Sequence, residues 1–238
     1  MSVCYPVALN LERKPCLVVG GGALALEKVE GLLRAGATVT TVAPHPNQAL
    51  ADLESDGRIV LRRSEYRPDD LGGTYLAYGA SADRALNARV ASDARERGII
   101  VNAVDDIPNC DFFAMAIVHR GDLQVAISTN GRSPAFARWM REELDASLPD
   151  ELDGLLTLLG DIRSQLKASE AVPPYQTWRA AITPRVLELL QVGDADGADA
   201  ALRSGLLPDQ DAGTESAPDS GPPAALSSWK LRPLVETA

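Results

Sequence analysis

The feature that most constrains the fold is a glycine-rich junction between an apolar run and a helical pattern. Cys16–Val19 is a short apolar run, glycines follow it, and apolar residues then recur at helical spacing over 23–35. The junction carries the pattern Gly20-x-Gly22-x-x-Ala25. The first glycine permits a tight turn, and the second lets a pyrophosphate approach the backbone at a helix N-terminus. The pattern predicts a dinucleotide site, with a merely tight turn as the alternative.

The second strand expected, 38–43, ends without the acid that usually binds the ribose hydroxyls of the nucleotide. Its end reads Val42-Ala43-Pro44-His45, so the ribose would be held by the main chain or by His45. Nothing basic is placed there for a 2′-phosphate, which favours NAD over NADP. The residues expected to contact the cofactor in these two segments are Gly20, Gly22, Ala23, Leu24, Ala43, Pro44 and His45.

Helices and strands alternate along the first half of the chain, which predicts βαβ units and a Rossmann-type parallel sheet of the α/β class. The further strands are expected at 59–62, 75–78 and 99–104, and the further helices at 47–55 and 83–97. The pattern then changes. Two strand-like runs, 112–119 and 123–129, are separated by Arg120-Gly121-Asp122 and predict a β-hairpin.

Three helices are expected after the hairpin. The first begins at Ser133-Pro134 as N-cap and first turn and runs to Leu144, and the others cover 152–167 and 178–192. The domains expected are therefore a dinucleotide-binding domain at 1–111, a hairpin segment at 112–147, a small helical domain at 148–192, and an acidic segment at 193–238. The last is rich in Gly, Ala, Asp, Ser and Pro and is expected to remain disordered.

Charge and composition exclude several classes of protein. The net charge of −10 argues against general nucleic-acid binding. The segment 119–141 is nevertheless locally basic, which indicates either an anionic small ligand or a solvated face. No apolar run approaches the roughly 18 residues of a membrane span. We expect a cytoplasmic location, because no secretion signal is evident and the three cysteines are isolated.

No protein metal site is expected. The chain has two histidines, His45 and His119, and neither has a Cys, His or Asp partner at ligand spacing.

Several segments together resemble one family, the precorrin-2 dehydrogenases and sirohydrochlorin ferrochelatases, which also form the N-terminal half of siroheme synthase. The resemblance covers about 5–190, and its most specific segments are VNAVDD at 101–106 and AISTNGRSPAFARWMREEL at 126–144. The other segments are Tyr5-Pro6, VVGGGALALEKVEGLLRAGA, TVAP and LAYGASAD.

The resemblance implies NAD-dependent oxidation of precorrin-2 to sirohydrochlorin, with insertion of ferrous iron in some members. It implies a homodimer in which 112–147 is the dimerisation segment, and it places Ser81 near the cofactor. It assigns catalysis to Asp105 as general base. An Asx turn or a helix cap before Ile107-Pro108 is the alternative role for Asp105, and Asp106 is the second candidate for the base.

The tetrapyrrole implied by the resemblance is a polycarboxylate, so hydroxyls, turn amides and guanidinium groups would bind it. The candidates are Thr129, Asn130, Arg132 and Arg138. Ordinary turn chemistry and helix-surface salt bridges with Glu142 or Glu143 are the alternatives for these residues. At the level of function, the alternatives are a non-catalytic NAD(H) sensor and an unrelated dehydrogenase on the same fold.

Overall fold

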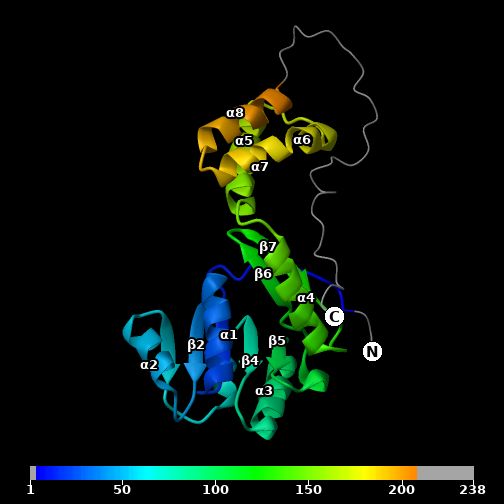
Figure 1. Ribbon diagram of the computed structural model, residues 1–238. Helices are drawn as coiled ribbons and strands as arrows, with labels where there is room; N and C mark the ends of the chain where they lie inside the picture. The colour runs from blue at the N-terminus through cyan, green and yellow to red at the C-terminus, as the bar shows by residue number, and fades with distance from the viewer. Residues whose placement is uncertain (1–3, 208–238) are drawn as a thin grey trace, which may run out of the picture. The chain divides into compact units, whose positions relative to one another are not determined.

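The computed structural model describes residues 4–207 (Figure 1). It divides into two units, Met1–Ala114 and Met115–Ala238. Within the described residues, no helix is both long and apolar enough to cross a membrane.

The first unit is built on a parallel sheet with the strand order β3-β2-β1-β4-β5. Its strands are β1 (Pro15–Val19), β2 (Thr38–Val42), β3 (Ile59–Arg62), β4 (Leu76–Gly79) and β5 (Ile100–Ala103). Its helices are α1 (Ala23–Arg34), α2 (Gln48–Ser55), α3 (Arg84–Glu96) and the 3₁₀ turns η1 (Pro68–Leu71) and η2 (Ile107–Asn109). The Rossmann-type sheet predicted from the alternation is confirmed. The chain order reverses at β1, between β2 and β4, which is where such sheets bind ligands.

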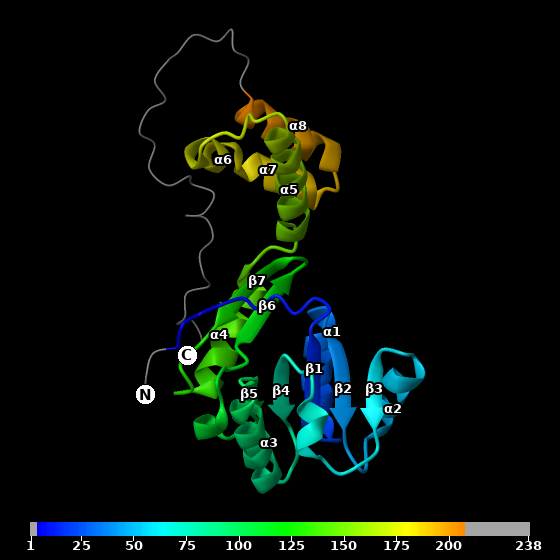
Figure 2. The same cartoon turned by 180° about the vertical axis from the view of Figure 1, so that it is seen from behind.

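Helices cover both faces of this sheet because alternate residues of β1 point in opposite directions. Val18 packs in one core with Val29 of α1, whereas Leu17 and Val19 pack in a second core with Val90 of α3. Figure 1 shows α1 in front of the sheet, and in Figure 2, seen from behind, β1 lies in front of α1. The parallel strands are therefore buried on both sides, as their near-continuous apolar sequences require.

The second unit begins with an antiparallel hairpin, as predicted, and continues with helices. Its elements are β6 (Ala116–Arg120), β7 (Leu123–Ile127), α4 (Pro134–Ser147), α5 (Leu152–Ala168), α6 (Tyr175–Ala181), α7 (Pro184–Gln191) and α8 (Ala195–Leu206). The side chain of Ser133 caps α4 by accepting a hydrogen bond from the Phe136 N–H (3.2 Å). Arg120 ties the hairpin to the end of α4 through Asp145 (2.8 Å) and the main-chain oxygen of Leu148 (3.0 Å).

Two expectations for the second unit are wrong. The single helix expected at 178–192 is two helices, because Pro184 lacks an N–H and disfavours helical geometry at Thr183. The segment after 192 also folds in part. Asp194 caps α8, and the buried side chains of α8, Ala198, Leu202 and Leu206, join the core of α5 and α7. The expectation of disorder is thus wrong for 195–206, and its remainder at 208–238 lies outside the described residues.

Candidate functional site

The glycine turn after β1 is fastened to the strands on both sides of it. The Gly20 N–H donates to the Val42 oxygen (3.0 Å), and the Ala80 N–H donates to the Val19 oxygen (2.8 Å). Gly20 has φ +145°, and a Cβ there would lie 2.4 Å from the Ala80 oxygen. Glycine at position 20 is therefore required by the close approach of β1 and β4.

Gly22 differs from Gly20, because nothing within residues 4–207 requires a glycine there. Its φ of −95° suits any residue, and a Cβ would meet no heavy atom within 4 Å. Gly22 is the N-cap of α1 and has no side chain to bind the first N–H groups of the helix. Those N–H groups have no partner within the helix and attract anions. A pyrophosphate would fill the open space beside Gly22 and accept hydrogen bonds from these N–H groups. A glycine at position 22 is therefore consistent with a bound dinucleotide.

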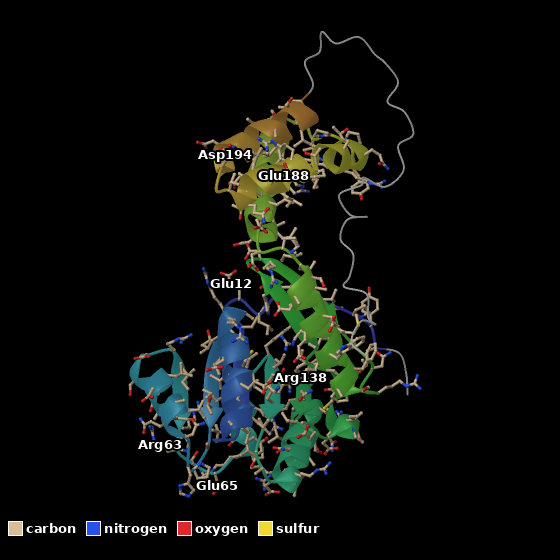
Figure 3. All side chains as sticks on the ribbon, viewed as in Figure 1. Glu12, Arg63, Glu65, Arg138, Glu188 and Asp194 are labelled. Atoms are coloured by element: carbon tan, nitrogen blue, oxygen red, sulfur yellow. The ribbon has the colours of Figure 1, made fainter. Side chains whose placement is uncertain are left out.

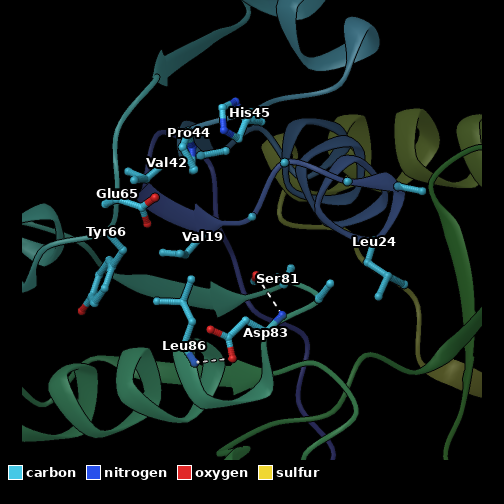
Figure 4. A pocket seen from close by; sticks show the side chains of 17 residues that line it. Val19, Leu24, Val42, Pro44, His45, Glu65, Tyr66, Ser81, Asp83 and Leu86 are labelled. Carbon is cyan, nitrogen blue, oxygen red and sulfur yellow. Dashed lines mark hydrogen bonds between the residues drawn. The ribbon is translucent and has the colours of Figure 1, made fainter.

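A cavity of about 530 Å³ lies beside this turn (Figure 4). It is lined by Val19, Gly20, Gly21, Gly22, Ala23, Leu24, Val42, Ala43, Pro44, His45, Glu65, Tyr66, Ala80, Ser81, Ala82, Asp83 and Leu86. All the residues predicted to contact the cofactor are among them. Sequence reasoning missed the wall formed by Glu65, Tyr66, Asp83 and Leu86. No local motif marks Glu65 and Tyr66, because the pairing of β3 with β2 brings them to the cavity.

Tyr66 forms part of the cavity wall and is held by several contacts. Its side chain is buried, its hydroxyl donates to the Asp93 carboxylate (2.9 Å), and the Arg89 guanidinium lies 5.5 Å from the ring centroid. Burial is the main cause that raises the pKa of Tyr66 above its usual value, and the hydrogen bond to Asp93 adds to it. The phenol therefore stays neutral at physiological pH.

The main chain at Ser81, which lines the cavity, is hydrogen-bonded to the buried side-chain amide of Asn87. Asn87 of α3 is 2% exposed, its Oδ1 accepts from the Ser81 N–H (2.9 Å), and its Nδ2 donates to the Ser81 oxygen (2.9 Å). Gly79 makes room for this side chain, since a Cβ at Gly79 would lie 3.0 Å from the Asn87 Cα. Asn87 thus positions the β4–α3 loop that faces the cavity.

Asn87→Ala is expected to lower the free energy of unfolding by about 1–3 kcal/mol, because both main-chain groups of Ser81 lose their partner. Urea unfolding followed by circular dichroism measures the change. Gln48→Ala, a change at an exposed helix position, serves as the control and should stay within about 0.5 kcal/mol. Equal stabilities of the two variants would contradict the positioning role of Asn87.

Asp105 follows β5 at the same edge of the sheet as the cavity, although it is not among the residues that line the cavity. The Val104 N–H donates to the Gly79 oxygen (2.9 Å), which ties the segment to β4. Asp105 has φ +60°, a left-handed conformation, and Arg84 Nη2 donates to its main-chain oxygen (3.1 Å). A non-glycine residue held in this region is uncommon and often marks a functional site.

The carboxylates of Asp105 and Asp106 differ in their surroundings. Asp105 is exposed, and its carboxylate makes no hydrogen bond or ion pair within residues 4–207. Asp106 is the N-cap of η2, and its carboxylate accepts a hydrogen bond from Asn109 Nδ2 (2.8 Å). Of the two candidates, the carboxylate of Asp105 is therefore the one available to a ligand.

The substrate-binding candidates all belong to the second unit. Thr129 Oγ1 accepts from the Ser133 N–H (3.2 Å) and donates to the Ser133 oxygen (3.3 Å), so its hydroxyl takes part in turn chemistry. Asn130 sits in this turn at φ +51°. Arg132 is exposed and makes no ion pair within the described part of the chain. A role in substrate binding remains a prediction for these residues.

Arg138 is already paired on the surface of α4 (Figure 3). Its Nε lies 2.9 Å from Glu142 Oε1, which is the helix-surface salt bridge considered as the alternative. This hydrogen bond raises the pKa of Arg138 and lowers that of Glu142. The Arg138 side chain is 78% exposed, so the pair is solvent-screened and could open for an anionic ligand.

Residues 4–207 contain no group of three or more His, Cys, Asp or Glu side chains placed to hold a metal ion.

Two families match parts of the chain. Residues 7–116 match the family described as "Putative NAD(P)-binding", and residues 120–147 match the "Sirohaem biosynthesis protein central" family. The first unit is thus an NAD(P)-binding domain. The structure of SirC, a precorrin-2 dehydrogenase, matches with a TM-score of 0.69 and 23% sequence identity, covering 84% of this chain and 100% of that one. This likeness confirms the fold.

The relatives with higher identity are siroheme synthases. That of Photobacterium profundum is 36% identical over 197 residues, which are 81% of this chain and 42% of the relative. That of Cronobacter sakazakii is 37% identical over 203 residues, 84% of this chain and 43% of the relative. The chain spans less than half the length of these relatives. Together with the two family matches, these identities show that the chain is similar to part of the siroheme synthases.

Proposed function

We propose that the protein oxidises precorrin-2 to sirohydrochlorin with NAD as hydride acceptor. The observation that carries the proposal is the pairing, at one sheet edge, of a dinucleotide cavity that is open at Gly22 with the exposed carboxylate of Asp105. The kinship with siroheme synthases and the likeness to a structure named precorrin-2 dehydrogenase support the choice of substrate.

The chain's own residues bind and orient the reactants. The turn at Gly20–Gly22 and the N-terminus of α1 hold the pyrophosphate, while Ser81, held by Asn87, lines the cavity on the β4 side. NAD, when bound, supplies the acceptor for the hydride. Asp105 accepts the proton that leaves the substrate in addition to the hydride, so that two electrons and two protons are removed in total, as one hydride and one proton. The contacts of Val104 and Arg84 hold the main chain that carries this carboxylate.

We further propose that Thr129, Asn130, Arg132 and Arg138 bind the carboxylates of the tetrapyrrole. Arg132 is the strongest candidate, because its guanidinium is exposed and engaged in no ion pair within the described residues. A planar guanidinium binds a carboxylate with two parallel hydrogen bonds. Arg138 would have to exchange its partner Glu142 for the substrate.

The name of the relatives, siroheme synthase, extends the proposal to insertion of ferrous iron into sirohydrochlorin. Iron is then a substrate. The nitrogens of the tetrapyrrole would coordinate it, and Asp105 would accept the two displaced pyrrole protons one after the other and pass each to solvent.

The experiment is anaerobic mixing of the purified protein with precorrin-2 and NAD, followed by addition of ferrous iron. The expected result is the absorbance change to sirohydrochlorin with equimolar formation of NADH, followed by protein-dependent formation of siroheme. If NADH binds but precorrin-2 is unchanged, the dehydrogenase proposal is wrong and a non-catalytic NAD(H) sensor is favoured. If oxidation occurs and iron insertion is no faster than without protein, only the second activity is wrong.

We propose a homodimer formed through the second unit, and a cytoplasmic location that fits the isolated cysteines. The sheet β6–β7 has only two strands and both are edge strands, and α4 exposes Phe136 (51%) and Trp139 (38%), whose ring centroids lie 5.4 Å apart. Trp139→Glu is expected to convert a dimer to a monomer in sedimentation equilibrium. The exposed Tyr175→Glu is the control, and a monomeric wild-type protein would contradict the proposal.

A further inference from the structure

The carboxyl ends of β2 and β3 lie side by side, and the segments that follow them form one wall of the cavity. Val42 is paired with Arg62, and the Ala43 N–H donates to the Arg62 oxygen (3.0 Å). The segment after β3 therefore runs beside the segment after β2. Glu65 lines the cavity from this position together with Ala43, Pro44 and His45. Figure 4 shows Glu65 near Val42, Pro44 and His45, across from Ser81 and Asp83.

The charges on the cavity wall are acidic. The lining residues include Glu65 and Asp83, and no Lys or Arg is among the described residues that line it. The Asp83 carboxylate is committed to capping α3, where it accepts from the N–H groups of Ala85 (2.8 Å) and Leu86 (3.3 Å). The Glu65 carboxylate has no hydrogen bond or ion pair within residues 4–207. Glu65 is therefore the carboxylate of the wall that a ligand can use.

Two arginines precede Glu65, and both are paired with acids outside the cavity lining. Arg62 lies 2.9 Å from Asp70, and Arg63 lies 2.7 Å from Glu54. Figure 3 shows Arg63 and Glu65 at the same end of the first unit, opposite Glu12. The two arginines nearest to Glu65 in sequence, which could otherwise bind a 2′-phosphate, are thus already in ion pairs with Asp70 and Glu54.

We propose that Glu65 is the residue that selects NAD over NADP in this cavity. In many dinucleotide-binding domains an acid at the end of the second strand binds the ribose, but β2 ends here in Val42-Ala43-Pro44-His45. Glu65, which follows β3, takes the place of that acid. Its carboxylate accepts hydrogen bonds from the ribose hydroxyls of NAD and repels the 2′-phosphate of NADP. Repulsion of the wrong ligand is an efficient source of specificity, because it adds to the loss of the attractive contact. This inference rests on the proposed use of NAD.

The test is the affinity of the purified chain for NADH and NADPH, measured by nucleotide fluorescence or calorimetry without any tetrapyrrole. Wild-type protein is expected to bind NADH at least about tenfold more tightly than NADPH. Glu65→Gln should weaken NADH binding by about tenfold, because a hydrogen bond to a charged group is lost. It should also reduce the preference for NADH over NADPH. Glu65→Arg should reverse the preference, because a guanidinium binds a phosphate.

Glu96→Gln is the matched control, since it removes the same charge from an exposed position near the far end of α3. It should leave both affinities unchanged. An unaltered NADH to NADPH ratio in both Glu65 variants would overturn the inference while leaving the proposed dehydrogenase intact. If wild-type protein binds neither nucleotide, the proposed function itself fails.

Discussion

Asp105→Asn is expected to slow precorrin-2 oxidation by about 10²–10⁴-fold, the usual contribution of a general base. The substitution removes the charge and little else. Asn tolerates the left-handed backbone found at φ +60°, and the exposed carboxylate has no described partner to lose. The free energy of unfolding should therefore change by less than about 0.5 kcal/mol, and NADH affinity should be unaffected. Steady-state rates, urea unfolding and NADH titration measure the three quantities.

Asp106→Asn is the matched control, because it makes the same change at the neighbouring residue. The Asp106 carboxylate is already hydrogen-bonded to Asn109 (2.8 Å). Asp106→Asn should therefore lower the rate of precorrin-2 oxidation far less than Asp105→Asn does. The assignment of the base to Asp105 fails if a folded Asp105→Asn protein keeps the full rate. If Asp106→Asn is the inactive variant, the roles of the two residues are exchanged.

Gly22→Val is expected to weaken NADH binding by about 100-fold, equivalent to about 2.7 kcal/mol, while the protein stays folded. The Cβ would meet no heavy atom of the described residues within 4 Å, and the φ of −95° is accessible to valine. The new side chain would occupy the space through which a pyrophosphate approaches the helix N-terminus. The cost to stability should be no more than about 1 kcal/mol, since valine is a poor N-cap. Fluorescence titration and urea unfolding separate the two effects.

Gly20→Ala provides the contrast, because Gly20 is restricted by the protein itself. A Cβ there would lie 2.4 Å from the Ala80 oxygen, at φ +145°. The free energy of unfolding should fall by about 2–4 kcal/mol. Comparable destabilisation by both substitutions would mean that Gly22 has a structural role. Unaltered NADH affinity in Gly22→Val would contradict the proposal that this turn binds the pyrophosphate.

Features that depend on neighbours in sequence were predictable without a structure. The strand, turn and helix over 16–35 follow from apolar periodicity and glycine spacing, and the hairpin at 116–127 follows from two apolar runs around Arg120-Gly121-Asp122. The N-cap at Ser133 likewise needs only its own turn of helix. The positions predicted for cofactor contact in the glycine turn and at the end of β2 line the cavity, because each is a local feature, whereas Ser81 was predicted from the family resemblance.

The tertiary structure alone decided the rest. Residues 195–206 look disordered by composition, yet α8 folds because the core of α5 and α7 buries Leu202 and Leu206. Glu65 reaches the cavity because parallel pairing sets β3 beside β2, a register that no short motif encodes. The carboxylate of Asp105 makes no hydrogen bond within the described residues, whereas that of Asp106 accepts one from Asn109. Sequence patterns specify what each segment can form within a few residues, whereas strand register, burial and competing hydrogen bonds arise between segments and settle which side chains remain available for chemistry.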